Sequence, residues 1–238
     1  MILLILASGK GTRLGRLTRS KPKCMVTINK KAILEYSIPA FKYFKKIFIV
    51  VGYKKKIIMK RIKKVNYIEN KNFRNTNMVE SIFKAKKFIN DNLVIMYSDI
   101  IFDTEIIKNI LKLKKNIMPV NANWLKLWKL RMSKKKFYKD AESITISKGN
   151  IIEIGSRIKH KLPKYQFMGI LKIVKKDYHK LFYFYKKLHN KKIDFTSFLN
   201  LAIKNNTIKI KPSYTKKFWV EIDSKNDFVA ANKLLKKN

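Results

Sequence analysis

Cysteine and long apolar runs are the two features that this 238-residue sequence most clearly lacks. Its single cysteine, Cys24, excludes an internal disulfide and agrees with a reducing cytoplasm, where we expect the protein to lie. No run approaches the roughly 18 apolar residues of a membrane span, so we expect no transmembrane segment. The apolar start at residues 1–6 is short and has no basic region before it, which predicts a buried first strand and not a signal peptide.

Acidic residues are also scarce, because 15 aspartates and glutamates stand against 56 lysines and arginines, for a formal net charge of +41. A charge of this size is typical of nucleic-acid-binding proteins. However, only seven of the basic residues are arginine, whose planar fork suits phosphate recognition, and the lysines are spread along the whole chain. We therefore interpret the charge as a solvated lysine surface that favours anionic substrates, with no specific nucleic-acid partner.

The first half of the chain alternates buried strands with amphipathic helices. Short runs rich in Ile and Val predict the strands, and longer segments carry apolar residues at helical spacing. This alternation is typical of an α/β fold in which a mixed, mostly parallel sheet has helices on both faces. The predicted strands are residues 2–6, 47–51, 93–97 and 117–120, and the predicted helices are residues 33–44, 76–89 and 104–113.

After Asn121 the pattern changes. Residues 143–147 and 151–154 flank Lys148-Gly149-Asn150, which predicts a β-hairpin. No internal repeat or low-complexity linker interrupts the chain, and its length suits one core, so we expect a single domain over residues 1–238. The remaining predicted strands are residues 167–174, 208–211 and 219–222, and the remaining predicted helices are residues 178–188, 195–205 and 224–236.

A glycine-containing loop follows the first predicted strand, in the sequence Ala7-Ser8-Gly9-Lys10-Gly11-Thr12-Arg13-Leu14. Glycines there allow backbone turns in which several N–H groups converge on phosphate oxygens. The loop is not a Walker loop, which needs Gly-Lys-Ser/Thr at its end, and it is not a Gly-x-Gly-x-x-Gly motif, because position 14 is leucine. The cations Arg13 and Lys23, the latter in Lys21-Pro22-Lys23, can bracket a triphosphate from two sides. The alternative is a tight turn beside ordinary surface cations.

Three carboxylates stand in apolar surroundings. Asp99 follows a buried strand, at the edge where open α/β sheets bind ligands. Glu221 and Asp223 lie on another strand-like run, and the alternation of side chains puts them on the same face. Carboxylate oxygens are the ligands that Mg²⁺ prefers, so the three residues are candidate ligands for that ion. The alternative for Asp99 and Asp223 is that they cap the segments that follow them.

The pattern Gly-x-Gly-Thr-Arg-Leu followed by Lys-Pro-Lys resembles the N-terminal signature of the sugar-phosphate nucleotidyltransferase superfamily. That resemblance implies a Rossmann-like three-layer fold of the GT-A type, with Mg²⁺ held by Asp99 and Asp223. It also implies that Arg13 contacts the leaving pyrophosphate and that Lys23 contacts the α-phosphate and the acceptor. Relatives carry a glycine before the first metal aspartate, where this chain has Ser98. The loop residues that would wrap the phosphates are Ala7, Ser8, Gly9, Gly11 and Thr12.

Further segments resemble one branch of the superfamily, the cytidylyltransferases that activate phosphocholine, 2-aminoethylphosphonate or related small acceptors. Residues 75–81 resemble the start of their nucleotide-side helix, which places Asn77 and Ser81 near the base and ribose; an ordinary helix cap is the alternative. Segments around Trp124, Asp140 and Gln166 resemble the central signature of the branch. The lysine-rich residues 133–139 depart from it, since relatives have a short Asn-Pro turn there.

The acceptor pocket is the part of the site that the sequence leaves most open. Trp124 and Asp140 suggest an aromatic wall and an anionic contact, which suit an amine or a quaternary ammonium. Alternatively, Trp124 and Trp128 form one apolar helix face, at positions i and i+4. Gln166 is a further candidate contact. Phosphocholine, 2-aminoethylphosphonate, phosphoethanolamine and an amidated or sugar phosphate all remain compatible.

These patterns together predict a Mg²⁺-dependent enzyme that transfers CMP from CTP to a small phosphate or phosphonate and releases pyrophosphate. One alternative is a uridylyl- or thymidylyltransferase that acts on a sugar 1-phosphate. An alternative of another class is a basic nucleic-acid-binding protein that keeps the fold without catalysis. The three histidines match no metal-ligand spacing, and the oligomeric state is not indicated by the sequence.

Overall fold

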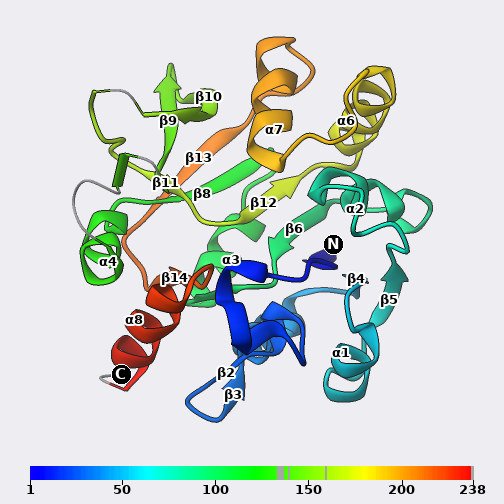
Figure 1. The fold of residues 1–238 in the computed structure, drawn as a ribbon. Coiled ribbons are helices and arrows are strands. Elements are labelled where there is room, and N and C mark those ends of the chain that lie inside the picture. Colours follow the sequence, from blue (N-terminus) through cyan, green and yellow to red (C-terminus); the bar gives the residue numbers. More distant parts are fainter. Residues whose placement is uncertain (133–136, 139, 159, 237–238) are drawn as a thin grey trace.

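A mixed eight-stranded sheet forms the centre of the computed structural model, which describes residues 1–132, 137–138, 140–158 and 160–236 (Figure 1). Six of its strands run parallel to one another: β1 (Ile2–Ala7), β4 (Lys46–Val51), β5 (Asn66–Glu69), β6 (Leu93–Tyr97), β8 (Ile117–Asn121) and β13 (Lys211–Thr215). Two run antiparallel to their neighbours: β11 (Gln166–Phe167) and β12 (Ile170–Ile173), the latter inserted between β6 and β8. The strand order is β11-β8-β12-β6-β1-β4-β5, and β13 also pairs with β8.

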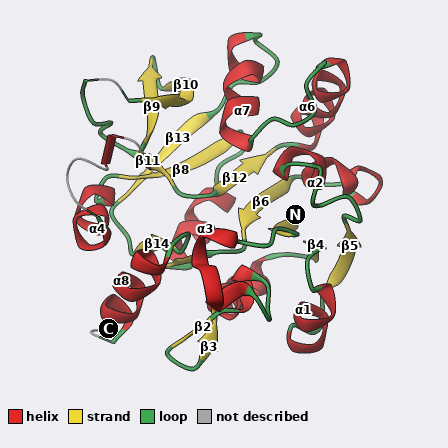
Figure 2. Ribbon diagram, in the orientation of Figure 1, coloured by secondary structure: helices red, strands yellow, loops and turns green. Residues whose placement is uncertain are grey.

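Helices cover both faces of this sheet, because the strands are apolar on both sides (Figure 2). In β1, Ile2, Leu4 and Leu6 enter one core, and the alternate side chains enter the other. The first core contains α2 (Met78–Lys84), α6 (Lys175–Lys187) and α7 (Phe195–Lys204). The second contains η3 (Ile33–Tyr43), α1 (Lys55–Arg61), α3 (Glu105–Leu111) and α4 (Trp124–Arg131). The predicted α/β class, with its mostly parallel sheet, is confirmed.

A third, smaller core packs together the segments that carry the candidate site residues. It lies beneath a two-stranded sheet in which β7 (Ile100–Phe102) pairs antiparallel with β14 (Trp219–Glu221). Ile101 and Val220 of these strands pack with Leu14 and Val26. The cluster also joins η1 (Thr12–Thr18), Val26 just after η2 (Lys23–Met25), β2 (Thr27–Ile28), which forms a hairpin with β3 (Lys31–Ala32), and α8 (Lys225–Leu235).

The predicted hairpin after Asn121 is confirmed as β9 (Glu142–Ser147) and β10 (Asn150–Arg157). The predicted strand at residues 167–174 is wrong in its continuity, because it breaks at Gly169 into β11 and β12. Gly169 has φ 72°, and a Cβ there would lie 2.8 Å from the Tyr97 ring. The strand expected at residues 208–211 begins at Lys211 instead, because Ile210 turns to form a bridge with Ile151.

Several elements were not anticipated from the sequence, among them α1, β5, β7 and the hairpin of β2 and β3. The predicted helix at residues 76–89 is shorter than expected, since α2 ends at Lys84 and only η4 (Lys86–Phe88) continues it. The helix predicted at residues 33–44 forms as the 3₁₀ segment η3, which contains Pro39. Among the described residues, no helix is long and apolar enough to cross a membrane.

Lys172 is a buried lysine on strand β12, and only 1% of its surface is exposed. Its ammonium donates to the carbonyl of Ile110 at 3.1 Å and also to that of Leu113, at the end of α3. Carbonyls at a helix C-terminus have no partner within the helix and carry partial negative charge. Lys172 therefore caps α3 from the core.

We expect Lys172→Met to lower the free energy of unfolding by about 2–4 kcal/mol, because it leaves buried carbonyls without a donor. Chemical denaturation followed by circular dichroism measures the loss. The exposed neighbour Lys176 provides the control, since Lys176→Met should change stability by less than about 0.5 kcal/mol. Equal effects of the two substitutions would contradict the capping role.

Candidate active site

The loop after β1 is shaped by glycine and by hydrogen bonds to neighbouring elements. Gly11 has φ 71°, and a Cβ at this position would lie 2.5 Å from Cβ of Lys23. Only glycine therefore allows the loop to approach the Lys23 segment this closely. On the other side, the hydroxyls of Ser8 and Ser81 hydrogen bond at 3.0 Å, and Tyr53 N donates to Ser8 O at 3.0 Å.

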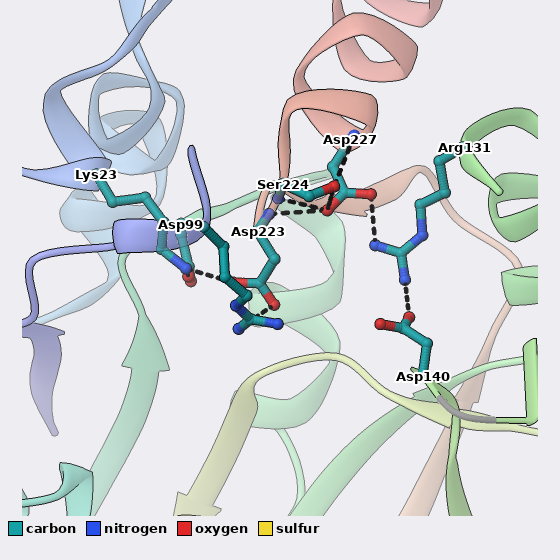
Figure 3. A network of polar contacts seen from close by, with 8 residues as sticks. Lys23, Asp99, Arg131, Asp140, Asp223, Ser224 and Asp227 are labelled. Carbon is teal, nitrogen blue, oxygen red and sulfur yellow. Dashed lines mark hydrogen bonds and ion pairs between the residues drawn. The ribbon is translucent and has the colours of Figure 1, made fainter. Parts of the chain in front are cut away.

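Lys23 lies between two carboxylates that are 124 positions apart in the chain (Figure 3). Its ammonium forms ion pairs with Asp99, just beyond the end of β6, and with Asp223, just beyond β14. Arg13 reaches the same carboxylate of Asp223 with its Nη2 at 3.0 Å. The backbone joins the two acidic segments, because Ile222 N donates to Asp99 O at 2.9 Å.

Glu221 completes a cluster of three carboxylates with Asp99 and Asp223. One oxygen from each of the three lies within 4.8 Å of the others. Three hard oxygen donors this close repel one another unless a cation lies between them, and they match the ligand chemistry of Mg²⁺. The residues present therefore fit a divalent cation.

The pKa values of these groups follow from burial and mutual charge. Burial lowers the pKa of Lys23, but Asp99 and Asp223 outweigh it, and the net pKa lies above the ordinary value. Burial raises the pKa of Asp99 despite the ion pair with Lys23. Burial and the two neighbouring aspartates hold the pKa of Glu221 well above its usual range. Burial also acts to raise the pKa of Asp223, but Lys23 and Arg13 bring it below the ordinary value. Lys23 is thus a permanent cation at neutral pH.

A cavity of about 190 Å³ opens above the loop and the carboxylates. It is bounded by the end of β1, by the end of β6 and by the residue that opens α2. Such a position, outside the carboxyl ends of parallel strands, is where α/β folds bind nucleotides. Its lining includes Ala7, Ser8, Gly9, Gly11, Arg13, Lys23, Met78, Tyr97, Asp99, Glu221 and Asp223.

A second cavity, of about 230 Å³, adjoins the first and shares with it Arg13, Met78, Tyr97, Glu221 and Asp223. Its wall is acidic although the chain is strongly basic. Arg13 and Arg131 are its only cations among the described residues, and five acids line it: Asp140, Glu142, Asp194, Glu221 and Asp223. A larger cavity of about 630 Å³ lies beside β9 and β10, and none of its lining residues belongs to either of the two cavities above.

The residues predicted for the acceptor pocket divide into two groups. Asp140 and Gln166 line the second cavity. Gln166 is 5% exposed, and within the described part of the chain its Oε1 has no hydrogen-bond partner. Trp124 lies behind the wall, 2% exposed, with its Nε1 donating to Pro163 O at 3.1 Å. Trp128 lines the cavity in its place. Trp124 packs against Trp128 inside the protein, as expected if it belongs to an apolar helix face.

The residues predicted to bind the nucleotide differ in their burial and in their contacts. Asn77 caps α2, since its Oδ1 accepts from Met78 N at 2.8 Å. Ser81 is buried, and it orients Ser8 by the hydroxyl contact described above. Thr12 is exposed at the start of η1. Cys24 is buried in the second core, and burial raises the pKa of its thiol to about 12, which agrees with a structural role.

Several cavity residues were not singled out from the sequence, among them Met78, Tyr97, Glu142 and Asp194. The scarcity of acids is the signal that could have found the two carboxylates, since Glu142 and Asp194 are two of only 15. Nothing in the local pattern distinguishes Met78 or Tyr97 from ordinary core residues.

Comparison with known proteins agrees with this geometry. Residues 3–122 match the model of the MobA-like NTP transferase domain. The chain is 30% identical to a CTP:phosphoglutamine cytidylyltransferase of Campylobacter jejuni, over 95% of this chain and 97% of that protein. In fold, it resembles the CTP:phosphocholine cytidylyltransferase of Streptococcus pneumoniae, with a TM-score of 0.78 and 20% identity over 98% of this chain and 99% of that one.

A further structural neighbour is the inositol-1-phosphate CTP transferase of T. maritima, with a TM-score of 0.74 and 20% identity over 98% of this chain and 95% of that one. At this identity the two structural matches establish the fold alone. The family rests on the match of half the chain to the domain model and on the C. jejuni relative, which aligns over nearly its whole length. The chain therefore belongs to the MobA-like NTP transferase family and is a nucleotidyltransferase.

Proposed function

We propose that this nucleotidyltransferase transfers CMP from CTP to a small phosphate or phosphonate acceptor and releases pyrophosphate. The observation that carries the proposal is the convergence of Lys23 on Asp99 and Asp223 beneath the glycine loop, between two adjoining cavities. One domain of residues 1–238 provides both substrate sites, and the reaction takes place in the cytoplasm.

The reaction is an in-line displacement. An anionic oxygen of the acceptor attacks the α-phosphorus of CTP, a new P–O bond forms, and the bond to the bridging oxygen breaks as pyrophosphate leaves. The attacking oxygen already carries negative charge at neutral pH, so no general base is needed. Loop amides near Gly9 and Gly11 bind the phosphates, Arg13 faces the pyrophosphate, and the permanent charge of Lys23 stabilises the α-phosphoryl group.

Asp99 and Asp223 would hold Mg²⁺, with Glu221 as a third oxygen donor. A bound Mg²⁺ supplies positive charge against which the phosphate oxygens are oriented and neutralised. In its absence Lys23 provides the neutralising charge. A lysine that pairs with both aspartates therefore lies next to the place where the α-phosphoryl group must bind.

The acceptor cavity favours a ligand that carries positive charge and N–H donors. This cavity is the second one described above, of about 230 Å³. Two of its five carboxylates, Glu221 and Asp223, are the proposed metal ligands, and Asp140 pairs with Arg131. Glu142 and Asp194 therefore remain to face a cationic group. The Oε1 of Gln166 is a buried acceptor with no donor among the described residues. Phosphocholine, phosphoethanolamine and 2-aminoethylphosphonate meet the charge requirement. The name of the C. jejuni relative adds phosphoglutamine, whose amide and amine offer both features.

We expect Asp99→Asn and Lys23→Ala each to lower turnover at least about 100-fold, because each removes a charge that the transition state requires. With Mg²⁺ present to neutralise the remaining carboxylates, the circular dichroism spectrum of both variants should be unchanged. Pyrophosphate release at saturating substrate measures the loss. Asp103→Asn is the matched control, since Asp103 lies four residues beyond Asp99 and lines neither cavity. Near-normal turnover of either site variant would refute the mechanism.

A panel of four NTPs against small phosphates tests the substrates. We expect pyrophosphate release with CTP to exceed that with the other nucleotides at least about tenfold, a difference of about 1.4 kcal/mol in transition-state binding. Among acceptors, those with a positively charged nitrogen should be preferred to glucose 1-phosphate. Preference for UTP or dTTP with a sugar phosphate would replace the proposed substrates. Salt-dependent nucleic-acid binding without any pyrophosphate release would refute enzymatic function altogether.

Gly11→Ala tests the close approach of the loop. We expect at least about a tenfold loss of kcat/KM for CTP, because the added Cβ displaces Lys23. Gly149→Ala is the matched control: its φ of 69° imposes similar strain, but none of the described residues lies within 4 Å of the added Cβ. Gly149→Ala should lose about 1 kcal/mol of stability and Gly11→Ala more, because of its contact with Lys23, and only Gly11→Ala should lose activity. Equal activity in both would contradict the steric argument.

A further inference from the structure

Asp227, in the first turn of α8, makes more contacts than a helix cap requires. Its Oδ2 accepts from Asp223 N at 3.0 Å, from Ser224 N at 2.8 Å and from Ser224 Oγ at 3.0 Å. These bonds fix the backbone at Asp223, the residue whose carboxylate pairs with Lys23. Asp227 is 2% exposed, so the bonds are formed away from water.

The second oxygen of Asp227 faces Arg131 of α4, whose Nη1 donates to Oδ1 at 2.9 Å (Figure 3). The other end of the same guanidinium pairs with Asp140, which lines the acceptor cavity. Arg131 is 7% exposed, and a buried arginine needs both carboxylates to offset its desolvation. Asp227 and Asp140 are thus bound to one rigid cation.

The aromatic neighbours of Arg131 extend the connection to β14. The guanidinium carbon lies 3.6 Å from the ring centroid of Trp128, and Trp128 stacks on Trp219 at 5.7 Å between centroids. Trp219 opens the strand that ends at Glu221. The segment from Glu221 to Asp223 is therefore held from both sides in sequence. The stacked rings of Trp128 and Trp219 hold the strand that precedes it, and Asp227 binds the backbone at its end.

We propose that Asp227 is a positioning residue that sets the Asp223 carboxylate for the metal and the α-phosphate, with Arg131 linking it to the wall of the acceptor cavity. This inference rests on the proposed function. The observation that a capping role leaves unexplained is the buried ion pair with Arg131, because the cap needs only Oδ2. Partners that orient a metal ligand in this way typically change metal affinity by about 10–100-fold when removed.

Asp227→Asn is the direct test. The amide keeps one acceptor for the backbone of Asp223 but meets Arg131 with its NH₂ group, so two donors face each other. We expect Mn²⁺ binding in the presence of CTP, measured by electron paramagnetic resonance, to weaken at least about tenfold. The Mg²⁺ concentration for half-maximal turnover should rise by a similar factor, and kcat should fall more than the KM for the acceptor changes.

Ser224→Ala is the control on the same helix. It removes the side-chain cap of α8 but leaves the backbone bonds to Asp227 and the contact with Arg131. We expect this variant to lower the melting temperature without changing Mn²⁺ affinity. If Asp227→Asn does not fold, Arg131→Lys provides the test, because it keeps a cation beside Asp227 and loses only the fork. That variant should weaken Mn²⁺ binding severalfold.

The outcomes separate this inference from the function on which it rests. Wild-type protein that neither binds Mn²⁺ nor releases pyrophosphate would overturn the proposed function and the inference together. Wild-type protein that does both, alongside folded Asp227→Asn or Arg131→Lys with unchanged Mn²⁺ affinity, would overturn the inference alone and leave Asp227 as a helix cap.

Discussion

The repulsion between the carboxylates of Asp99 and Asp223 is the constraint around which the site is arranged. Two buried aspartates with Glu221 beside them destabilise the folded chain unless a cation neutralises them. Lys23 supplies that cation, and it reaches the pair only because Gly11 leaves room for its side chain. The glycine loop, the lysine and the acids are therefore parts of one electrostatic arrangement.

The small third core keeps these charges in register. Leu14 follows Arg13, Val26 lies three residues beyond Lys23, and Ile222 separates Glu221 from Asp223; all three pack in this cluster. Each of these packed side chains lies within three residues of a charged one, so the backbone between them restricts how far the charged residue can move. Packing in this cluster thus limits the movement of groups that are far apart in the chain.

Much of this arrangement could be predicted from the sequence. Strands β1 and β6 are continuous apolar runs, and the loop motif after β1 resembles a phosphate-binding signature, so Arg13, Lys23 and Asp99 could be named as candidates without coordinates. Local periodicity could not reveal the break at Gly169, because it arises from the close approach of Tyr97, which is distant in sequence. The same limit applies to the wall of the acceptor cavity. Trp124 and Trp128 are equivalent on a helix face, and only the tertiary packing decides that Trp128 faces the cavity.

The net charge of the chain and the charge of the second cavity are opposite in sign. Lysines that are solvated at the surface are screened over about a Debye length of 8–10 Å, whereas charges in a cavity of low dielectric are not. A third of the acids in the sequence line one cavity, where they create a local negative potential inside a protein of net charge +41. In the proposed reaction, the surface charge would attract a nucleotide from a distance, and the cavity wall would select the acceptor at short range. An acceptor that combines a phosphate with a positive group would suit both fields in the proposed reaction, because its anionic end would face Arg13 and Lys23 while its cationic end would face acids such as Glu142 and Asp194.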